Sequence, residues 1–182
     1  MDLVGNLLIA PPAVKNNFWA KTVIFITEHH AQGSVGLVLN KRSQMSITEF
    51  GAQLGYPIDA PGFVYLGGPV NPKNLSFLHT NDWASINTMR INDKFSLSSA
   101  EDIMPRLAAG DRPEQWRLFL GLCGWSPKQL LGEISGEAPW KHENSWCTAR
   151  GKIDIVFGSD NKDQWCTALD CSGQEFAQSM LA

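Results

Sequence analysis

Two short apolar runs in the first half of the chain decide the fold: TVIFIT at residues 22–27 and SVGLVL at residues 34–39. Both runs are rich in β-branched residues and too short for buried helices, so they predict strands. Residues 28–33 between them suit a turn, which predicts an antiparallel hairpin. Because both runs are almost continuously apolar, we expect these two strands in the centre of a sheet.

The rest of the chain continues with short strands and helices. Further strands are predicted, from the same apolar pattern, at residues 63–66, 75–78, 85–91, 94–97 and 117–122. This order of elements predicts an α+β fold. We expect a single compact domain over residues 1–182, with a mixed, mostly antiparallel sheet packed by helices on its faces.

Helix starts are marked by capping boxes, in which a serine and a Glu or Gln three residues later satisfy backbone donors of the first turn. The pattern occurs at Ser46/Glu49, Ser98/Glu101, Ser126/Gln129 and Ser172/Glu175. The helix after Ser98 contains Pro105, which should end or kink it before Gly110. A further helix is expected over residues 161–169.

The composition is that of an ordinary globular protein with a slightly acidic balance. The 182 residues are 43% hydrophobic and carry 15 Lys and Arg against 18 Asp and Glu, a formal net charge of -3. Binding to a phosphate backbone depends on clustered basic residues, so we expect no direct contact with nucleic acid. No apolar run approaches the roughly 20 residues that cross a bilayer, and an acid follows Met1 where a signal peptide would carry positive charge. We therefore expect a cytoplasmic protein that does not enter a membrane.

The cysteines at positions 123, 147, 166 and 171 have neither CxxC spacing nor a nearby histidine that would suggest a zinc site. They predict reduced structural thiols, and we expect no bound metal or cofactor. Cys123 lies shortly before the helix that follows Ser126, where a helix dipole would lower the pKa of a thiol. Packing in the interior is nevertheless the interpretation we favour over a catalytic thiol.

Several blocks of the sequence are together similar to one bacterial protein family. They are residues 7–11 (LLIAP), 23–29 (VIFITEH), 33–41 (GSVGLVLNK), 67–70 (GGPV), 77–80 (FLHT), 120–121 (LG), 124–125 (GW), 129–130 (QL), 133–134 (EI) and 144–146 (NSW). In register over nearly the whole chain, these blocks resemble the YqgE/AlgH family. The resemblance implies a compact arrangement of a mixed sheet and helices, and it implies no established reaction. Some members are labelled transcriptional regulators of alginate synthesis, but nothing in this acidic sequence resembles a helix-turn-helix.

The polar stretch at residues 136–144 is expected to form an extended surface loop, longer than the link usual in the family. Trp140 and Trp146 would each be able to attach this loop to the body of the protein.

The predicted topology brings Asn40 and Lys41 close to the Gly67-Gly68 pair. A capped helix follows the hairpin and is long enough for a parallel return of the next strand, which places both turn segments at one end of the sheet. A cation, an amide and glycines that let a ligand approach the backbone suit a small anion. Trp125, next to a helix start, would form the wall of the cleft if the strand at 117–122 runs in the same direction, and packing in the core is an equal alternative for this ring. The predicted ligand-binding residues are therefore Asn40, Lys41, Gly67, Gly68 and Trp125, with ordinary turn chemistry as the structural alternative.

A second group of polar residues is expected at the opposite end of the sheet. There the strand after the Gly67-Gly68 turn should deliver His79 to the end that holds Glu28 and His29. These residue types suit a metal or acid–base chemistry, but neighbouring Glu28 and His29 would point in opposite directions on an extended segment. His30 and His142 are expected to be exposed.

Two hypotheses about function follow. The leading one is a non-enzymatic cytoplasmic domain that binds a small anionic ligand or a protein partner, with an indirect regulatory role. The alternative is a hydrolase-type or metal-assisted enzyme that uses His79 with Glu28 or His29. The open question is whether these side chains converge in an accessible concavity.

Overall fold

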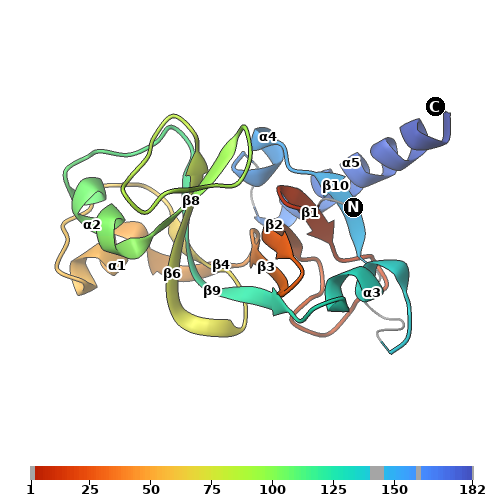
Figure 1. Ribbon diagram of the computed structural model, residues 1–182. Coiled ribbons are helices and arrows are strands. Elements are labelled where there is room, and N and C mark those ends of the chain that lie inside the picture. The colour runs from red at the N-terminus through yellow and green to blue at the C-terminus, as the bar shows by residue number, and fades with distance from the viewer. Residues whose placement is uncertain (1–2, 140–145, 159–160, 182) are drawn as a thin grey trace. The chain divides into compact units, whose positions relative to one another are not determined.

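The computed structural model describes residues 3–139, 146–158 and 161–181, and its elements are drawn in Figure 1. In chain order they are β1 (Asn6–Ile9), β2 (Val23–His30), β3 (Gly33–Val38), β4 (Arg42–Ser46), α1 (Ile47–Gln53), β5 (Phe63–Leu66), β6 (Val70–Thr80), β7 (Met89–Arg90), β8 (Phe95–Ser99), α2 (Ala100–Ala108), β9 (Trp116–Trp125), α3 (Gln129–Ser135), β10 (Cys147–Arg150), α4 (Ile153–Val156) and α5 (Asn161–Leu181). The expected α+β class is confirmed. Among the described residues, no helix is long and apolar enough to cross a membrane.

Contacts within the chain divide it into two compact units. Residues 1–40 and 123–182 form the first, called here the terminal unit, and residues 41–122 form the second, called the middle unit. The extent of the expected single domain, residues 1–182, stays a prediction.

Antiparallel pairing orders the strands of the terminal unit as β10-β1-β2-β3, followed by residues 123–125 at the end of β9. The middle unit has the order β4-β5-β9-β6-β8-β7, in which only the β5/β9 pair among the described strands is parallel. The expectation of a mixed, mostly antiparallel arrangement is therefore confirmed.

The central hairpin of β2 and β3 is confirmed, but its turn is shorter than predicted. The pairing runs from Ile24 opposite Val38 to His30 opposite Gly33, so the strands continue to the last residues before the turn. Gly33 has a φ of +142°, and a Cβ there would overlap the carbonyl oxygen of Trp125. Glycine thus lets the turn close tightly against β9. Glu28 belongs to strand β2 and not to a loop.

The middle unit departs from the predicted strand pattern at three places. Strand β4 was not predicted, and it pairs antiparallel with β5, so α1 connects an antiparallel pair and not a parallel one. Strand β6 begins at residue 70, earlier than predicted, and pairs with β9. The strand expected at 85–91 is reduced to the two residues of β7. Polar and apolar residues do not alternate regularly in these segments, so the sequence does not define where strand pairing begins and ends.

The predicted helix starts have mixed outcomes. The complete capping box at Ser46 is confirmed, with its side chain accepting from the Glu49 amide. The prediction at Ser98 is wrong by one position, because Ser99 is the N-cap of α2 while Ser98 is buried in β8. At Ser126 the Gln129 side chain accepts from the serine amide and hydroxyl, although α3 begins only at Gln129.

Helices α2 and α5 have different outcomes. Helix α2 continues through Pro105 and ends at Ala108, before Gly110 as predicted. Helix α5 runs unbroken from Asn161 to Leu181, so the predicted end near residue 169 and the new start at Ser172 are both wrong. Burial of Ala168 and Cys171 on the same helix favours continuity across this point.

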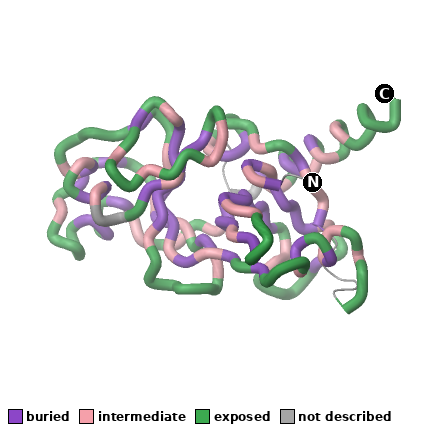
Figure 2. The backbone as a smooth tube through the Cα atoms, in the orientation of Figure 1, coloured by how far each residue is buried: buried purple, intermediate pink, exposed green. Residues whose placement is uncertain are grey.

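Each unit has its own hydrophobic core. In the terminal unit the buried core residues are Leu3, Leu8, Ala10, Val14, Ile24, Ile26, Val38, Cys123, Trp125, Leu130 and Trp146. In the middle unit they are Ile47, Phe50, Ile58, Ala60, Val64, Phe77, Trp83, Ile103, Met104, Leu107 and Leu118. Figure 2 shows that buried residues gather on the strands, whereas the outer end of α5 is exposed.

Candidate functional site

The predicted anion-binding residues are divided between the two units. Asn40 and Trp125 belong to the terminal unit, and Lys41, Gly67 and Gly68 belong to the middle unit. The structure therefore describes two separate groups, and the five-residue site stays a prediction.

Asn40 has a structural role in the terminal unit. Its Oδ1 accepts a hydrogen bond of 3.0 Å from the amide of Val23, and its Nδ2 donates one of 2.7 Å to the carbonyl oxygen of Lys21. The side chain thus continues the hairpin pairing beyond the end of β3. It also fixes the backbone of Lys21.

In the middle unit, Lys41 lies beside the segment that leads to the glycine pair. Its carbonyl oxygen accepts a 2.7 Å bond from the amide of Leu66, and burial lowers the pKa of its ammonium group. The amide of Gly67 donates a hydrogen bond to the carbonyl oxygen of Leu120. A Cβ at Gly121 (φ +73°) would overlap the carbonyl oxygen of Gly68. Close approach between the two backbones therefore requires glycine at position 121.

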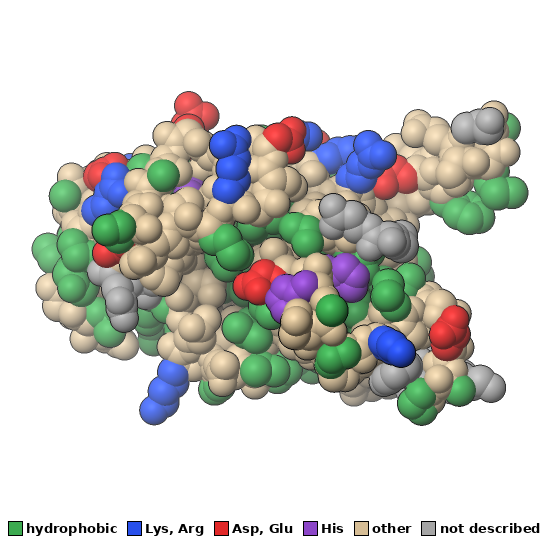
Figure 3. All heavy atoms as spheres, viewed as in Figure 1, with side chains coloured by type: hydrophobic (Ala, Val, Ile, Leu, Met, Phe, Trp, Pro, Cys, Tyr) green, Lys and Arg blue, Asp and Glu red, His purple; other side chains and the backbone are tan. Residues whose placement is uncertain are grey.

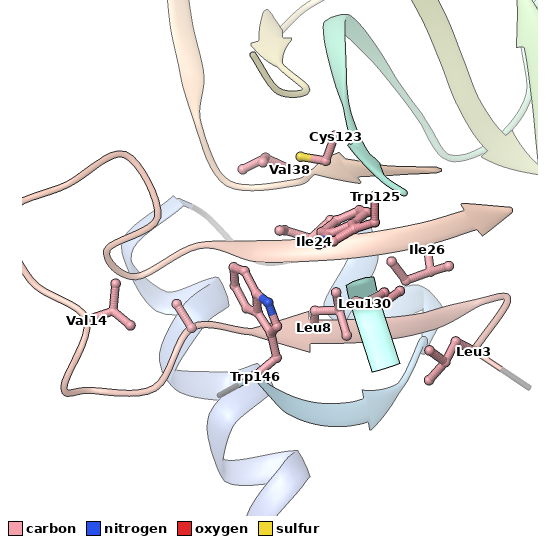
Figure 4. Close-up of a cluster of buried hydrophobic side chains, with 11 residues drawn as sticks. Leu3, Leu8, Val14, Ile24, Ile26, Val38, Cys123, Trp125, Leu130 and Trp146 are labelled. Carbon is pink, nitrogen blue, oxygen red and sulfur yellow. The ribbon is translucent and has the colours of Figure 1, made fainter. Parts of the chain in front are cut away.

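Trp125 contributes to a hydrogen-bonded cluster around Glu133. The indole groups of Trp125 and Trp146 donate to one carboxylate oxygen of Glu133 at 3.0 and 2.9 Å, and Gln129 donates to the other at 2.9 Å. Figure 4 shows Trp125 and Trp146 among the apolar side chains of the terminal unit. Both rings are buried, and the expectation that Trp146 attaches the preceding loop to the body stays a prediction. The other loop tryptophan, Trp140, and His142 lie outside the described residues, as does most of the stretch 136–144.

His79 is completely enclosed in the middle unit, with 0% of its surface exposed. Its Nδ1 donates to the carbonyl oxygen of Thr80 at 2.8 Å, so its Nε2 accepts from the hydroxyl of Ser98 at 2.9 Å. The rings of Phe77 and Trp83 lie 5.2 and 5.1 Å from the imidazole. Burial lowers the pKa of His79, partly opposed by the Thr80 bond and the Asp82 charge. The neutral ring is therefore a packed structural group.

Glu28 and His29 have separate partners in the terminal unit, as expected for neighbours on a strand. Glu28 pairs with exposed His30 at 3.5 Å, whereas Nδ1 of His29 lies 2.7 Å from the hydroxyl of Ser34. In the described part of the chain, no three His, Cys, Asp or Glu residues are grouped to hold a metal ion. The four cysteines are free, and burial raises the pKa of Cys123 to about 12. This thiol is therefore protonated and packed, as predicted.

A pocket of about 540 Å³ lies in the terminal unit between the segment that precedes β2 and helix α5. It is lined by Pro12, Val14, Lys15, Asn16, Ala20, Lys21 and Trp165. Lys15 and Lys21 are both exposed, and the ammonium of Lys21 lies 5.8 Å from the centre of the Trp165 ring. We name this cavity the lysine–tryptophan pocket. It combines two cations with an apolar floor.

Turn hydrogen bonds hold the segment that forms this pocket. The amide of Val14 donates to the carbonyl oxygen of Pro11 at 3.0 Å, and the amide of Ala20 donates to that of Asn17 at 3.2 Å. Trp165 is held from the other side, because its indole donates to the carbonyl oxygen of Ala10 at 2.7 Å. The pocket is thus formed before any ligand arrives.

The lysine–tryptophan pocket was not predicted, because its two sides are far apart in the sequence. The pair Pro11-Pro12, the pair Asn16-Asn17 and two nearby lysines are a signal for a structured basic turn. Trp165 lies far along the chain, and no spacing pattern connects it to this turn. Only the docking of α5 brings the ring to the lysines.

Fold and site together define an α+β protein with a preformed, lysine-lined surface pocket. The model of the AlgH-like family matches residues 7–177. A UPF0301 protein of Ruegeria pomeroyi is 34% identical over 178 residues, which cover 95% of this chain and 93% of that protein. Another from Gluconobacter oxydans is 36% identical over 174 residues, covering 93% and 90%. The chain belongs to the AlgH-like family, which confirms the resemblance found in the sequence.

Solved structures agree with this assignment. The solution structure of the AlgH protein from Pseudomonas aeruginosa matches with a TM-score of 0.74 and 29% identity, covering 94% of this chain and 89% of that one. A crystal structure of a protein from Corynebacterium diphtheriae has a TM-score of 0.69 at 23% identity, over 91% and 84% of the chains, and shares the fold.

Proposed function

We propose that this protein is a cytoplasmic, non-enzymatic binding domain, and that the lysine–tryptophan pocket receives a small organic anion. The observation that carries the proposal is the placement of Lys15 and Lys21 at the rim of a preformed apolar pocket. Two ammonium groups favour a carboxylate or phosphate, and the Trp165 ring offers a flat apolar surface. The volume is in the range of small-molecule sites.

The ligand chemistry follows from the lining. Val14, Ala20 and Trp165 favour an aromatic or branched aliphatic body, while the lysines favour one or two negative charges. A purely inorganic anion would leave the apolar floor exposed to water. Asn40 supports the site from behind by holding the Lys21 carbonyl oxygen. It therefore acts on the ligand through Lys21.

A regulatory role would follow if occupation of this pocket changed the affinity for a protein partner. The enzyme alternative gains no support from the geometry, since both ring nitrogens of His79 are used inside a closed core. The separate prediction that Lys41 binds the anion is distinguished from this proposal by the effect of Lys41→Gln on binding.

Isothermal titration calorimetry tests the proposal with three probes of the full chain. Benzoate has a flat apolar body with a carboxylate, benzamide has the same shape without the charge, and inorganic phosphate has the charge without the body. We expect benzoate to bind more tightly than both others. Lys15→Gln and Lys21→Gln should each weaken benzoate about fivefold, the upper range for a partly exposed ion pair.

Lys128→Gln is the matched control, because Lys128 is an exposed lysine of the terminal unit with a positive φ (66°) like that of Lys21 (54°). It should bind benzoate as the unmodified protein does. Equal affinity for benzoate and benzamide, or no loss in the Lys15 and Lys21 variants, contradicts the proposal. Loss of binding in Lys41→Gln alone would place the anion site in the middle unit instead.

A further inference from the structure

The outer end of helix α5 carries an apolar face that is exposed to solvent. Residues 176–181 are all exposed, and Phe176, Met180 and Leu181 show 68%, 72% and 90% of their surface. Figure 1 shows this end extending away from the other elements of the terminal unit, and Figure 3 shows hydrophobic side chains along its lower edge. This end belongs to a continuous helix of 21 residues, and a partner surface would remove its exposed apolar side chains from water.

A groove lies next to this apolar face within the same unit. It has a volume of about 850 Å³ and lies between α3, β10 and α5. Apolar groups come from Ile134, Trp146, Leu169 and Phe176, with hydroxyl groups of serines and a threonine at the sides. Phe176 thus belongs both to the groove and to the exposed face. The two features form one continuous surface.

Charge is almost absent from this surface. Glu175 is the one charged residue in the sequence from Ser172 to Leu181. Its carboxylate is directed to the body of the unit, where it accepts from the amide of Arg150 at 3.1 Å and lies 3.9 Å from the ammonium of Lys152. Two copies of this surface would therefore meet without repulsion between like charges.

Gly173 lies in the groove at the start of the exposed end. A glycine inside a helix costs about 1 kcal/mol relative to alanine. Contacts within the chain do not require it, because a Cβ at Gly173 would meet no atom within 4 Å. Ala177 follows one turn later, so the two small residues leave room for a second helix to approach the backbone.

We propose that this surface binds a second copy of the same chain, with the exposed end of α5 of each copy lying in the α3–β10–α5 groove of the other. The chain carries both the projecting apolar residues and the groove that fits them, as a two-fold symmetric interface requires. One helix end contributes only three large apolar side chains, which is small against the roughly 800 Å² per partner of a stable interface. Two-fold symmetry doubles the contact, because each copy contributes an end and a groove.

Sedimentation equilibrium of the full chain, from about 1 to about 500 µM, tests this inference. We expect a monomer–dimer equilibrium. Phe176→Glu and Met180→Glu should each raise the dissociation constant by about tenfold or more, since they bury a charge at the centre of the contact. Gly173→Leu should weaken the dimer equally while leaving the melting temperature of the monomer unchanged or higher, because the added side chain has open space and favours the helix.

Ile86→Glu is the matched control, since Ile86 is an 89% exposed apolar residue of the middle unit. It should leave the dissociation constant unchanged. A protein that stays monomeric over the whole range, or a dimer that resists all three α5 variants, overturns the inference. Binding of a monomeric protein to phosphatidylcholine vesicles would overturn it in favour of a lipid surface. These outcomes are independent of benzoate binding, because the lysine–tryptophan pocket lies about three helical turns earlier on α5, at Trp165, and shares no lining residue with the groove.

Discussion

The protonation state of the buried His79 is determined by its hydrogen-bond partners. His79 lies at the start of a directed chain of hydrogen bonds, because its Nε2 accepts from Ser98, whose hydroxyl lies 2.7 Å from that of Thr88. Thr88 in turn accepts from the amide of Ser85 at 2.7 Å. A protonated imidazole would have to donate where it now accepts. The cluster therefore stabilises the neutral form of His79.

This gives a pH-dependent stability with a definite sign. Burial lowers the pKa of His79 below its ordinary value of 6.5, so the unfolded chain binds a proton more readily than the folded protein. The contribution of His79 to the free energy of unfolding is fully present above about pH 6.5 and is lost as pH falls through the lowered pKa. We expect urea unfolding between about pH 8 and about pH 5 to show this loss.

His79→Gln isolates the contribution, because glutamine is polar but does not titrate. The variant should be less stable at neutral pH, and the difference from the unmodified protein should shrink as the solution becomes acidic. A difference that is constant over the whole pH range would show that His79 does not titrate in the folded protein with a lowered pKa.

The elements differ in how strongly local sequence defines their ends. Helix α1 has a complete local signal: Ser46 accepts from the amide of Glu49 at 3.1 Å, and Glu49 accepts from the amide of Ser46 at 2.9 Å. The Ser46 hydroxyl also donates to the Glu49 carboxylate at 2.7 Å, and this bond, together with the one from the Ser46 amide, lowers the pKa of the Glu49 carboxyl group. Helix α2 begins at Ser99 without a side-chain cap. The two helix starts form a natural pair for comparison.

Ser46→Ala should lower the free energy of unfolding by about 1 kcal/mol, because the amide of Glu49 loses its partner. Ser99→Ala, at the uncapped start of α2, should change it by less than about 0.5 kcal/mol. Chemical denaturation of both variants beside the unmodified protein provides the measurement. Equal losses of unfolding free energy in the two variants would contradict this prediction, because they would show that the capping hydrogen bond of Ser46 adds no stability of its own.

The charge distribution over the whole molecule determines whether it can bind a polyanion such as DNA. The formal net charge is -3, and some of the basic residues are already in contact with neighbouring groups. The guanidinium groups of Arg42 and Arg106, for example, lie 4.3 and 4.1 Å from the ring centres of Phe63 and Trp83. Counterion release needs several free cations on one face.

We therefore expect no retardation of double-stranded DNA in a gel-shift titration up to about 1 µM protein at physiological salt. Retardation in the nanomolar range that disappears in a Lys41→Gln, Arg42→Gln double variant would reveal a local basic patch. Retardation that falls steeply with added salt but does not depend on DNA sequence would indicate a non-specific contact, which also contradicts the expectation.

Features of this protein whose signals are local could be predicted from the amino-acid sequence alone. Continuous apolar runs defined the β2–β3 hairpin and β5, and the Ser46 capping box defined the start of α1. The predicted packing of Cys123 was also correct, because a small apolar side chain in a buried strand has few alternatives. Family membership could also be predicted, because several short blocks occur in the same order as in the YqgE/AlgH family.

Contacts between segments that are distant in the sequence could be identified only in the folded protein. Asn40 was predicted to contact a ligand, yet it closes the end of the hairpin, because Val23 and Lys21 happen to lie opposite it. Ser98 looked like a helix cap until pairing with β6 placed it in β8 beside His79. The lysine–tryptophan pocket depends on a tryptophan of α5 docking against a turn near the other end of the chain. Such contacts arise from packing between elements, whose free energy depends on the whole fold and leaves no pattern in a short stretch of sequence.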